Sequence, residues 1–168
     1  MCADKNIKLV IVSGLSGSGK STAMHTLEDL GYYCIDNLPM YLLHAMAEEL
    51  KQRPDAISER TAISIDARNL TEDLHQLSGL VKEIRQQGIH SEMIFLEAQD
   101  EVLLRRFSET RRKHPLTGDD RPLADAIKLE RKLLESYLSD ADLRIDTSST
   151  NQHELRDIIR AQMNERKP

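Results

Sequence analysis

The sequence contains no tryptophan and only 4% aromatic residues, which argues against a surface of exposed rings for stacking RNA bases. No run approaches the roughly 18 apolar residues that a membrane-spanning helix requires. The first ten residues, MCADKNIKLV, lack the long apolar core of a signal peptide. The only cysteines, Cys2 and Cys34, have no metal-site spacing, and Cys34 is expected to be a buried, small apolar side chain. We therefore expect a cytoplasmic, reduced protein without a membrane partner.

The net charge of −5 argues against a domain that binds nucleic acid through an overall basic character. The length of 168 residues suits a single domain with a sizeable core. Strand-like apolar runs alternate with helical patterns, and no repeat or linker divides the chain. This alternation predicts an α/β fold with a mainly parallel sheet of five strands.

The predicted elements occupy most of the chain. Strands are expected at Leu9–Ser13, Tyr32–Asp36, Thr61–Asp66, Glu92–Glu97 and Leu143–Asp146. Helices are expected at about Lys20–Leu30, Met40–Gln52, Glu72–Gln87, Asp100–Arg112, Leu123–Leu138 and Gln152–Glu165, the last capped by Thr150 or Asn151. In such a sheet, ligands bind beyond the carboxyl ends of the strands.

Residues 14–22 read GLSGSGKST and follow an apolar strand, which matches the phosphate-binding pattern G-x-x-x-x-G-K-[ST] between a strand and a helix. Glycines allow backbone N–H groups to turn toward a phosphate, Lys20 can reach the β- and γ-phosphates, and the Ser21 hydroxyl can bind Mg²⁺. The predicted nucleotide-binding residues are Gly14, Leu15, Ser16, Gly17, Ser18, Gly19, Lys20, Ser21 and Thr22. The alternative is a glycine-rich turn that binds nothing.

Asp66 ends an apolar strand in the run AISIDARN, which is the position of a Walker-B acid that orients Mg²⁺. Ser21 and Asp66 are therefore the predicted metal-binding residues. Ala67, Arg68 and Asn69 follow at the same edge of the sheet and are included in the predicted nucleotide site. The alternative for Asp66 is an aspartate that caps the next element.

Asp36 and Asn37 end the second predicted strand, in the run YCIDNLP. One interpretation is a substrate-facing acid that serves as a base toward a hydroxyl group or a water molecule. The other is a capped turn, because D-N-x-P favours turns and helix starts. Both interpretations stay open.

The basic segment, RRFSETRRKHP at residues 105–115, resembles the lid of small phosphate-loop kinases. Arg111 or Arg112 is predicted to contact nucleotide phosphate and to screen the charge that develops during phosphoryl transfer. The alternative is a solvated helix face.

Two absent motifs bear on the ligand. The sequence has no N-K-x-D run, so it does not select ATP over GTP. The six histidines do not form a metal set, and each is expected on the surface or in a helix.

These blocks together resemble one family. The stretches VSGLSGSGKSTAMHTLEDLGYYCIDNLP, SIDARN, IFLEAQDEVLLRRFSETRRKHPL and RIDTS are similar to the N-terminal half of the RapZ/YvcJ nucleotide-binding proteins of bacteria. The resemblance implies a kinase-like P-loop NTPase domain, a three-layer sandwich, that binds ATP and GTP with Mg²⁺ and hydrolyses them slowly. It places ATP at Gly14–Ser21 and GTP at Asp66–Asn69.

The resemblance also implies partners. The family has a C-terminal domain, absent here, that carries RNA binding and amino-sugar sensing. The enterobacterial member is an adapter that presents a small RNA to RNase E and lowers amino-sugar synthesis. We therefore expect residues 1–168 to form only the nucleotide-binding domain, with weak RNA binding. A homo-oligomer is compatible with the sequence.

Three functions compete on this basis. The first is a regulatory nucleotide-binding domain with weak NTPase activity. The second is a small-molecule kinase that uses Asp36 and the basic segment. The third is an interaction module that keeps the loop only as a scaffold.

Overall fold

The computed structural model describes residues 7–52, 59–65, 76–110 and 112–165. Its elements follow in the order β1 (Lys8–Gly14), α1 (Lys20–Asp29), β2 (Tyr33–Leu38), η1 (Met40–Leu42, a 3₁₀ turn), α2 (Leu43–Gln52), β3 (Arg60–Ile65), α3 (Gln76–Gln86), β4 (His90–Glu97), α4 (Asp100–Thr110), α5 (Leu123–Leu138), β5 (Leu143–Asp146) and α6 (Gln152–Glu165). Each predicted strand is present, with ends shifted by a residue or two, and α5, β5 and α6 have the predicted bounds.

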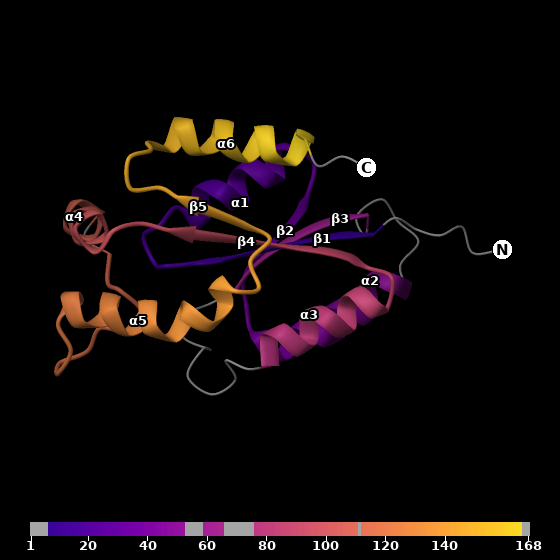
Figure 1. The fold of residues 1–168 in the computed structure, drawn as a ribbon, viewed down its shortest axis with the longest axis horizontal. Helices are drawn as coiled ribbons and strands as arrows, with labels where there is room; N and C mark the ends of the chain where they lie inside the picture. The colour runs from indigo at the N-terminus through magenta and orange to yellow at the C-terminus, as the bar shows by residue number, and fades with distance from the viewer. Residues whose placement is uncertain (1–6, 53–58, 66–75, 111, 166–168) are drawn as a thin grey trace.

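The five strands form one parallel sheet in the order β2-β3-β1-β4-β5. Helices α1 and α6 cover one face, and α2, α3 and α5 cover the other (Figure 1). The predicted α/β fold, with a three-layer arrangement around a five-stranded parallel sheet, is therefore confirmed.

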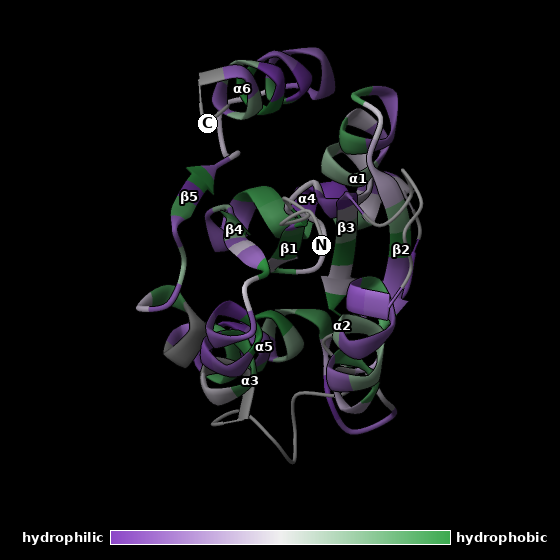
Figure 2. Cartoon of the chain, turned by 90° about the vertical axis from the view of Figure 1, so that its right-hand side faces the viewer, coloured by the Kyte–Doolittle hydropathy of each residue, from purple (hydrophilic) through white to green (hydrophobic). Residues whose placement is uncertain are grey.

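Alternating side chains of the strands build two cores. On β1, Leu9 and Ile11 pack toward α2, α3 and α5, whereas Val10 and Val12 pack toward α1 and α6. All four side chains are fully buried. Apolar residues accordingly line the interior of each helix layer, and polar residues lie on the outside (Figure 2). A strand buried on both faces needs a continuous apolar run, which is the pattern of β1.

Two predicted helices differ from the structure by more than one residue at a described end. The helix expected from Met40 divides into η1 and α2, because the Leu42 N–H bonds the Pro39 carbonyl at 3.0 Å in a tighter turn. Helix α4 ends at Thr110 instead of Arg112. The predicted start of α3 at Glu72 lies outside the described residues. Cys34 is half-buried, less than expected, because its strand β2 is at the edge of the sheet.

The strand order brings the site together. Gly14, at the end of β1, pairs with Leu96 of β4, and Leu96 pairs with Ile145 of β5. The loops that leave these three neighbouring strands therefore meet at one edge of the sheet, where the basic segment also lies after β4.

Candidate functional site

The loop after β1 begins with a close backbone approach. A Cβ atom on Gly14 would lie 2.3 Å from the Leu96 carbonyl oxygen, so only glycine fits there. The next N–H, that of Leu15, donates to the same oxygen at 3.1 Å. These contacts fix the direction in which the loop leaves the sheet.

The loop residues divide into a buried floor and an open wall. Residues 17–22 line a cavity of about 490 Å³. Gly14, Leu15 and Ser16 are buried and lie outside that lining. Ser18 is also buried, and its N–H donates to the Leu15 carbonyl at 3.0 Å. Six of the nine predicted nucleotide-binding residues therefore line the cavity and the first three do not, and phosphate binding at this loop stays a prediction.

Helix α1 begins directly at the cavity. Gly19 is its N-cap and provides no side-chain cap, and the first turn contains no acidic residue. Lys20 and Thr22 are half-buried, and Ser21 is exposed. The first N–H groups of a helix have no partner within the helix, and its N-terminus carries a partial positive charge. This end of α1 is therefore suited to an anion such as a phosphate group.

Arg106 of α4 also lines the cavity. Its Nη1 donates to the carbonyl oxygen of Gly17 and to Oγ1 of Thr147, each at 3.0 Å, and its Nη2 donates to the Thr147 carbonyl. Thr147 Oγ1 in turn donates to the Ser18 carbonyl at 2.7 Å. Burial, followed by repulsion from Arg105, lowers the pKa of Arg106 below its ordinary value. The guanidinium thus ties the loop to the end of β5.

The basic segment contributes only part of what was predicted. Arg112 lines the cavity and is exposed, so it lies where an anion can reach it. Arg111 lies outside the described residues. The contact of either arginine with phosphate remains a prediction.

The connection from β5 to α6 closes the cavity. Thr147, Thr150, Asn151 and Gln152 all line it. The Asn151 side chain accepts the Glu154 N–H at 2.8 Å, so the predicted N-cap of α6 is Asn151. The sequence-based prediction of the site missed Arg106 and Thr147, although both follow the rule that ligands bind at the carboxyl edge of the sheet.

Asp36 and Asn37 lie at the end of β2 and are not part of the cavity lining. The Asp36 carboxylate accepts a hydrogen bond from the Ser64 hydroxyl, which itself accepts the Asn37 N–H at 2.8 Å. The pairing of β2 with β3 shifts register between Ile35 and Leu38, and Asn37 has a φ of 54°. This left-handed conformation is uncommon outside glycine and often marks turns and functional sites.

The second predicted segment, Asp66–Asn69, lies outside the described residues, so the metal role of Asp66 stays a prediction. Within the part of the chain that the structure describes, no group of three or more His, Cys, Asp or Glu side chains is arranged to hold a metal. Ser21 lines the cavity and is exposed. A hydroxyl oxygen is a suitable ligand for Mg²⁺, which commonly takes few protein ligands and keeps waters and phosphate oxygens.

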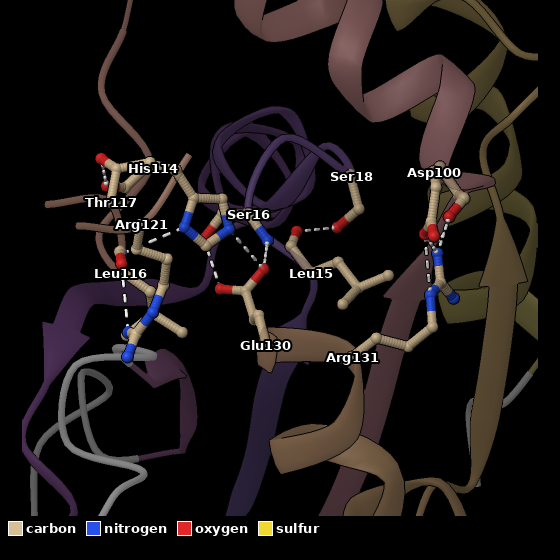
Figure 3. Close-up of polar contacts among 11 residues, drawn as sticks. Leu15, Ser16, Ser18, Asp100, His114, Leu116, Thr117, Arg121, Glu130 and Arg131 are labelled. Atoms are coloured by element: carbon tan, nitrogen blue, oxygen red, sulfur yellow. Dashed lines mark hydrogen bonds and ion pairs between the residues drawn. The ribbon is translucent and has the colours of Figure 1, made fainter. Parts of the chain in front are cut away.

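One expectation about the histidines is wrong. His114 is only 2% exposed and lies between α4 and α5, not in a helix. Its Nε2 lies 3.1 Å from a carboxylate oxygen of Glu130, which is fully buried on α5. The sequence-based prediction also missed Glu130, and Figure 3 shows both side chains next to Ser16 of the phosphate loop. The described histidines other than His114 are exposed, as expected: His25, His44, His90 and His153.

None of the helices in the described ranges is both long enough and apolar enough to cross a membrane.

Comparison with solved structures identifies the fold. The shikimate kinase of Acinetobacter baumannii, solved with shikimate, superposes with a TM-score of 0.63 at 16% identity, covering 97% of this chain and 96% of that one. A gluconokinase from Sinorhizobium meliloti gives a TM-score of 0.63 at 18% identity, covering 96% of this chain and 94% of that one. At these identities the likeness shows a kinase-like P-loop fold and nothing about the substrate.

Comparison by sequence identifies the family. A protein named "Nucleotide-binding protein" from Nitrosococcus oceani is 56% identical over 153 residues, which cover 91% of this chain and 53% of that protein. A protein of the same name from Halorhodospira halophila is 53% identical over 153 residues, with the same coverage. The chain thus spans about half the length of the curated relatives it matches. The family model for the RapZ-like N-terminal domain matches residues 7–167, so this chain belongs to the RapZ-like N-terminal domain family.

Proposed function

We propose that this chain is a Mg²⁺-dependent domain that binds ATP or GTP and hydrolyses it weakly. The observation that carries the proposal is the cavity of about 490 Å³ at the uncapped start of α1, lined by residues 17–22 and faced by Arg106 and Arg112. A helix N-terminus and two arginines that line the same cavity fit a polyphosphate. The names of the relatives from Nitrosococcus and Halorhodospira support a nucleotide as the ligand.

The proposed mechanism depends on positioning and charge neutralisation. Lys20 and the N–H groups at the start of α1 hold the β- and γ-phosphates, and Arg112 or Arg111 screens the charge that develops on the transferred group. Ser21, together with the predicted Asp66, would hold Mg²⁺. When bound, the metal neutralises charge shared by the β- and γ-phosphates.

Other residues of the lining are suited to the nucleoside. Thr150, Asn151 and Gln152 offer hydroxyl and amide groups, and Leu155 and Phe107 offer apolar surface. A nucleotide base needs apolar surface against its faces and polar groups at its edges, and these residues provide both. Neither a purine amine nor a purine carbonyl is favoured by these groups, in keeping with the proposed use of both ATP and GTP.

Isothermal titration calorimetry with MgATP and MgGTP tests the proposal. Lys20→Ala removes a charged phosphate contact and is expected to weaken binding by about 10- to 100-fold. Lys132→Ala, which removes an exposed lysine on α5, is the matched control and should bind as the unmodified chain does. Absence of saturable binding, or equal affinity of the Lys20 and Lys132 variants, would contradict the proposal. A turnover of about 1–100 s⁻¹ would contradict weak hydrolysis.

For the longer, cytoplasmic protein we propose a regulatory role, in which RNA and RNase E are the partners and the nucleotide state of this domain biases their binding. The support is membership in the RapZ-like family. The acidic balance of the chain, with a net charge of −5, makes it a poor RNA ligand by itself. A mobility-shift assay should therefore show much weaker RNA binding for this chain than for a full-length relative. Equal affinities would place RNA binding here. Sedimentation analysis decides whether the chain forms a homo-oligomer.

The position of Asp36 favours a second candidate, a small-molecule kinase. Its carboxylate lies at the carboxyl edge of β2 beside the left-handed Asn37, where a substrate hydroxyl could be received. A kinase would transfer the γ-phosphate of ATP to an added sugar acid or polyol faster than to water. Hydrolysis that no acceptor in such a screen accelerates would exclude it.

A further inference from the structure

A buried polar cluster joins Ser16 of the phosphate loop to His114 and Glu130 (Figure 3). One oxygen of Glu130 accepts the Ser16 N–H at 2.6 Å, and the other accepts the Ser16 hydroxyl at 2.6 Å. The side chains of His114 and Glu130 are both 0% exposed. A carboxylate rarely lies fully buried unless its partners satisfy it, so the arrangement requires a specific explanation.

The hydrogen bonds define which atoms carry protons. The Leu116 N–H donates to His114 Nδ1 at 3.1 Å, so Nδ1 is an acceptor and the proton lies on Nε2. Nε2 then donates to the Glu130 carboxylate. Burial raises the pKa of Glu130, but hydrogen bonds from His114 and Ser16 outweigh burial, so the pKa lies below its ordinary value. Glu130 is therefore an ionised acceptor of three hydrogen bonds.

The cluster also reaches the wall of the cavity. The His114 ring lies against Phe107, with ring centroids 5.3 Å apart. Phe107 lines the cavity and approaches Gly17 so closely that a Cβ there would lie 3.1 Å from its ring. Arg112, two residues before His114, lines the same cavity. One carboxylate thus holds both the loop and the basic segment.

The turn after His114 is itself well defined. The Thr117 N–H and hydroxyl both donate to the His114 carbonyl, at 3.1 and 2.6 Å. Arg121 donates to the Leu116 carbonyl at 3.3 Å. The position of His114 is therefore fixed on both sides, and a shift of the basic segment would have to disturb Glu130.

We propose that Glu130 and His114 are positioning residues that couple the phosphate loop to the basic segment, so that the loop and Arg112 are held ready for the polyphosphate. The inference rests on the proposed nucleotide binding and adds the means by which the site is preorganised. The Ser16 N–H is occupied by its bond to Glu130, and residues 17–22, which line the cavity, are the loop residues proposed to meet the anion. A loop that is already ordered loses less conformational entropy when the polyphosphate binds.

The first test compares Glu130→Gln with Glu135→Gln, an exposed glutamate on the same helix. A glutamine cannot accept from Ser16 on both sides, because its amide nitrogen is a donor. Glu130→Gln should weaken MgATP binding at least about tenfold, and Glu135→Gln should leave it unchanged. Ser16→Ala, which keeps the backbone N–H, is the milder variant that decides the question if Glu130→Gln does not fold. The affinity of Ser16→Ala for MgATP should fall several-fold. The double variant of Ser16→Ala and Glu130→Gln should lose less MgATP binding free energy than the two single variants lose when added together.

The second test is a double-mutant cycle between His114→Ala and Arg112→Ala. If His114 positions Arg112, removal of Arg112 should cost clearly less affinity when His114 is already absent. A merely structural histidine would lower the melting temperature and leave the two losses in affinity additive. Additive losses, or MgATP affinity unchanged by Ser16→Ala and Glu130→Gln, would overturn this inference alone. Failure of the unmodified chain to bind MgATP would overturn the proposed function as well.

Discussion

Gly14→Ala should lower the stability of the domain severely, because the phosphate loop begins at a backbone contact that leaves no space. The new Cβ would lie 2.3 Å from the Leu96 carbonyl oxygen and 2.9 Å from the Leu96 nitrogen, and both are atoms of β4, an interior strand paired on both sides. A flexible side chain can move aside, but a paired strand cannot. The φ of 148° at Gly14 adds backbone strain for any residue with a side chain.

The magnitude follows from two costs. Backbone strain at such a φ costs about 1–3 kcal/mol, and overpacking against a fixed neighbour costs about another 1–3 kcal/mol. The sum of about 2–6 kcal/mol is a large part of a typical domain stability of about 5–15 kcal/mol. For a chain of this size, each kcal/mol lowers the melting temperature by about 2–4 °C. We therefore expect a decrease of at least about 4 °C.

Two glycines serve as controls. Gly31 has a φ of 94°, but a Cβ added there would meet no atom within 4 Å, so alanine incurs only the conformational cost of about 1–2 kcal/mol. Gly118 has open space and no positive φ, so alanine there should change stability by less than about 0.5 kcal/mol. Urea denaturation followed by circular dichroism measures all three variants. If Gly14→Ala is no less stable than Gly31→Ala, the close contact with Leu96 does not cost the stability argued above.

Three further predictions concern charge and reactivity. Burial, followed by the charges of Glu28 and Asp36, raises the pKa of Cys34 to about 11. In a Cys2→Ser variant, the Cys34 thiol should therefore react with a disulfide reagent at pH 8 about 100-fold more slowly than a free cysteine does. Equal reaction rates would contradict this prediction. Arg106→Ala should weaken MgATP binding about tenfold through loss of its charged hydrogen bonds to the loop, whereas Arg105→Ala, at an exposed neighbour, should have little effect in the same titration. Because the folded-state pKa of Glu130 is lowered, its contribution to stability is present above the unfolded value of about 4.3 and is lost as the pH falls through the folded value. Denaturation curves from pH 6 to pH 3 should therefore decline less for Glu130→Gln than for the unmodified chain.

Much of the fold was predictable because local chemistry and global architecture agree in this chain. Helix α5 has its predicted bounds, since its apolar positions repeat with helical period and Pro122 comes just before it. Both ends of β5 were also predicted. The ends that moved have local causes: the helix after Pro39 begins with a 3₁₀ turn, and α4 ends at Thr110, four residues before His114, which is buried. No periodicity in the sequence encodes the burial of His114.

The site was predictable only where one short motif contains it. Residues 17–22 were predicted together because consecutive residues of a phosphate loop meet the same anion, and they do line one cavity. Arg106 and Thr147 are 41 residues apart, and their contact depends on β4 and β5 being neighbours in the sheet. Strand order follows from the whole topology, so single segments of the sequence do not identify such a pair.

Glu130 is an instructive case because the sequence does contain a signal for it. In α5 the buried residues Ile127 and Leu134 lie three positions before and four positions after Glu130, so the glutamate occupies the apolar stripe of its helix. A charged residue at such a position must find partners inside the protein or destabilise the fold. The pattern thus predicts a buried polar contact, but not its partner, because Ser16 lies 114 residues away. Helical periodicity can therefore indicate where a buried carboxylate must be satisfied, and the three-dimensional arrangement then shows that it is satisfied at the phosphate loop.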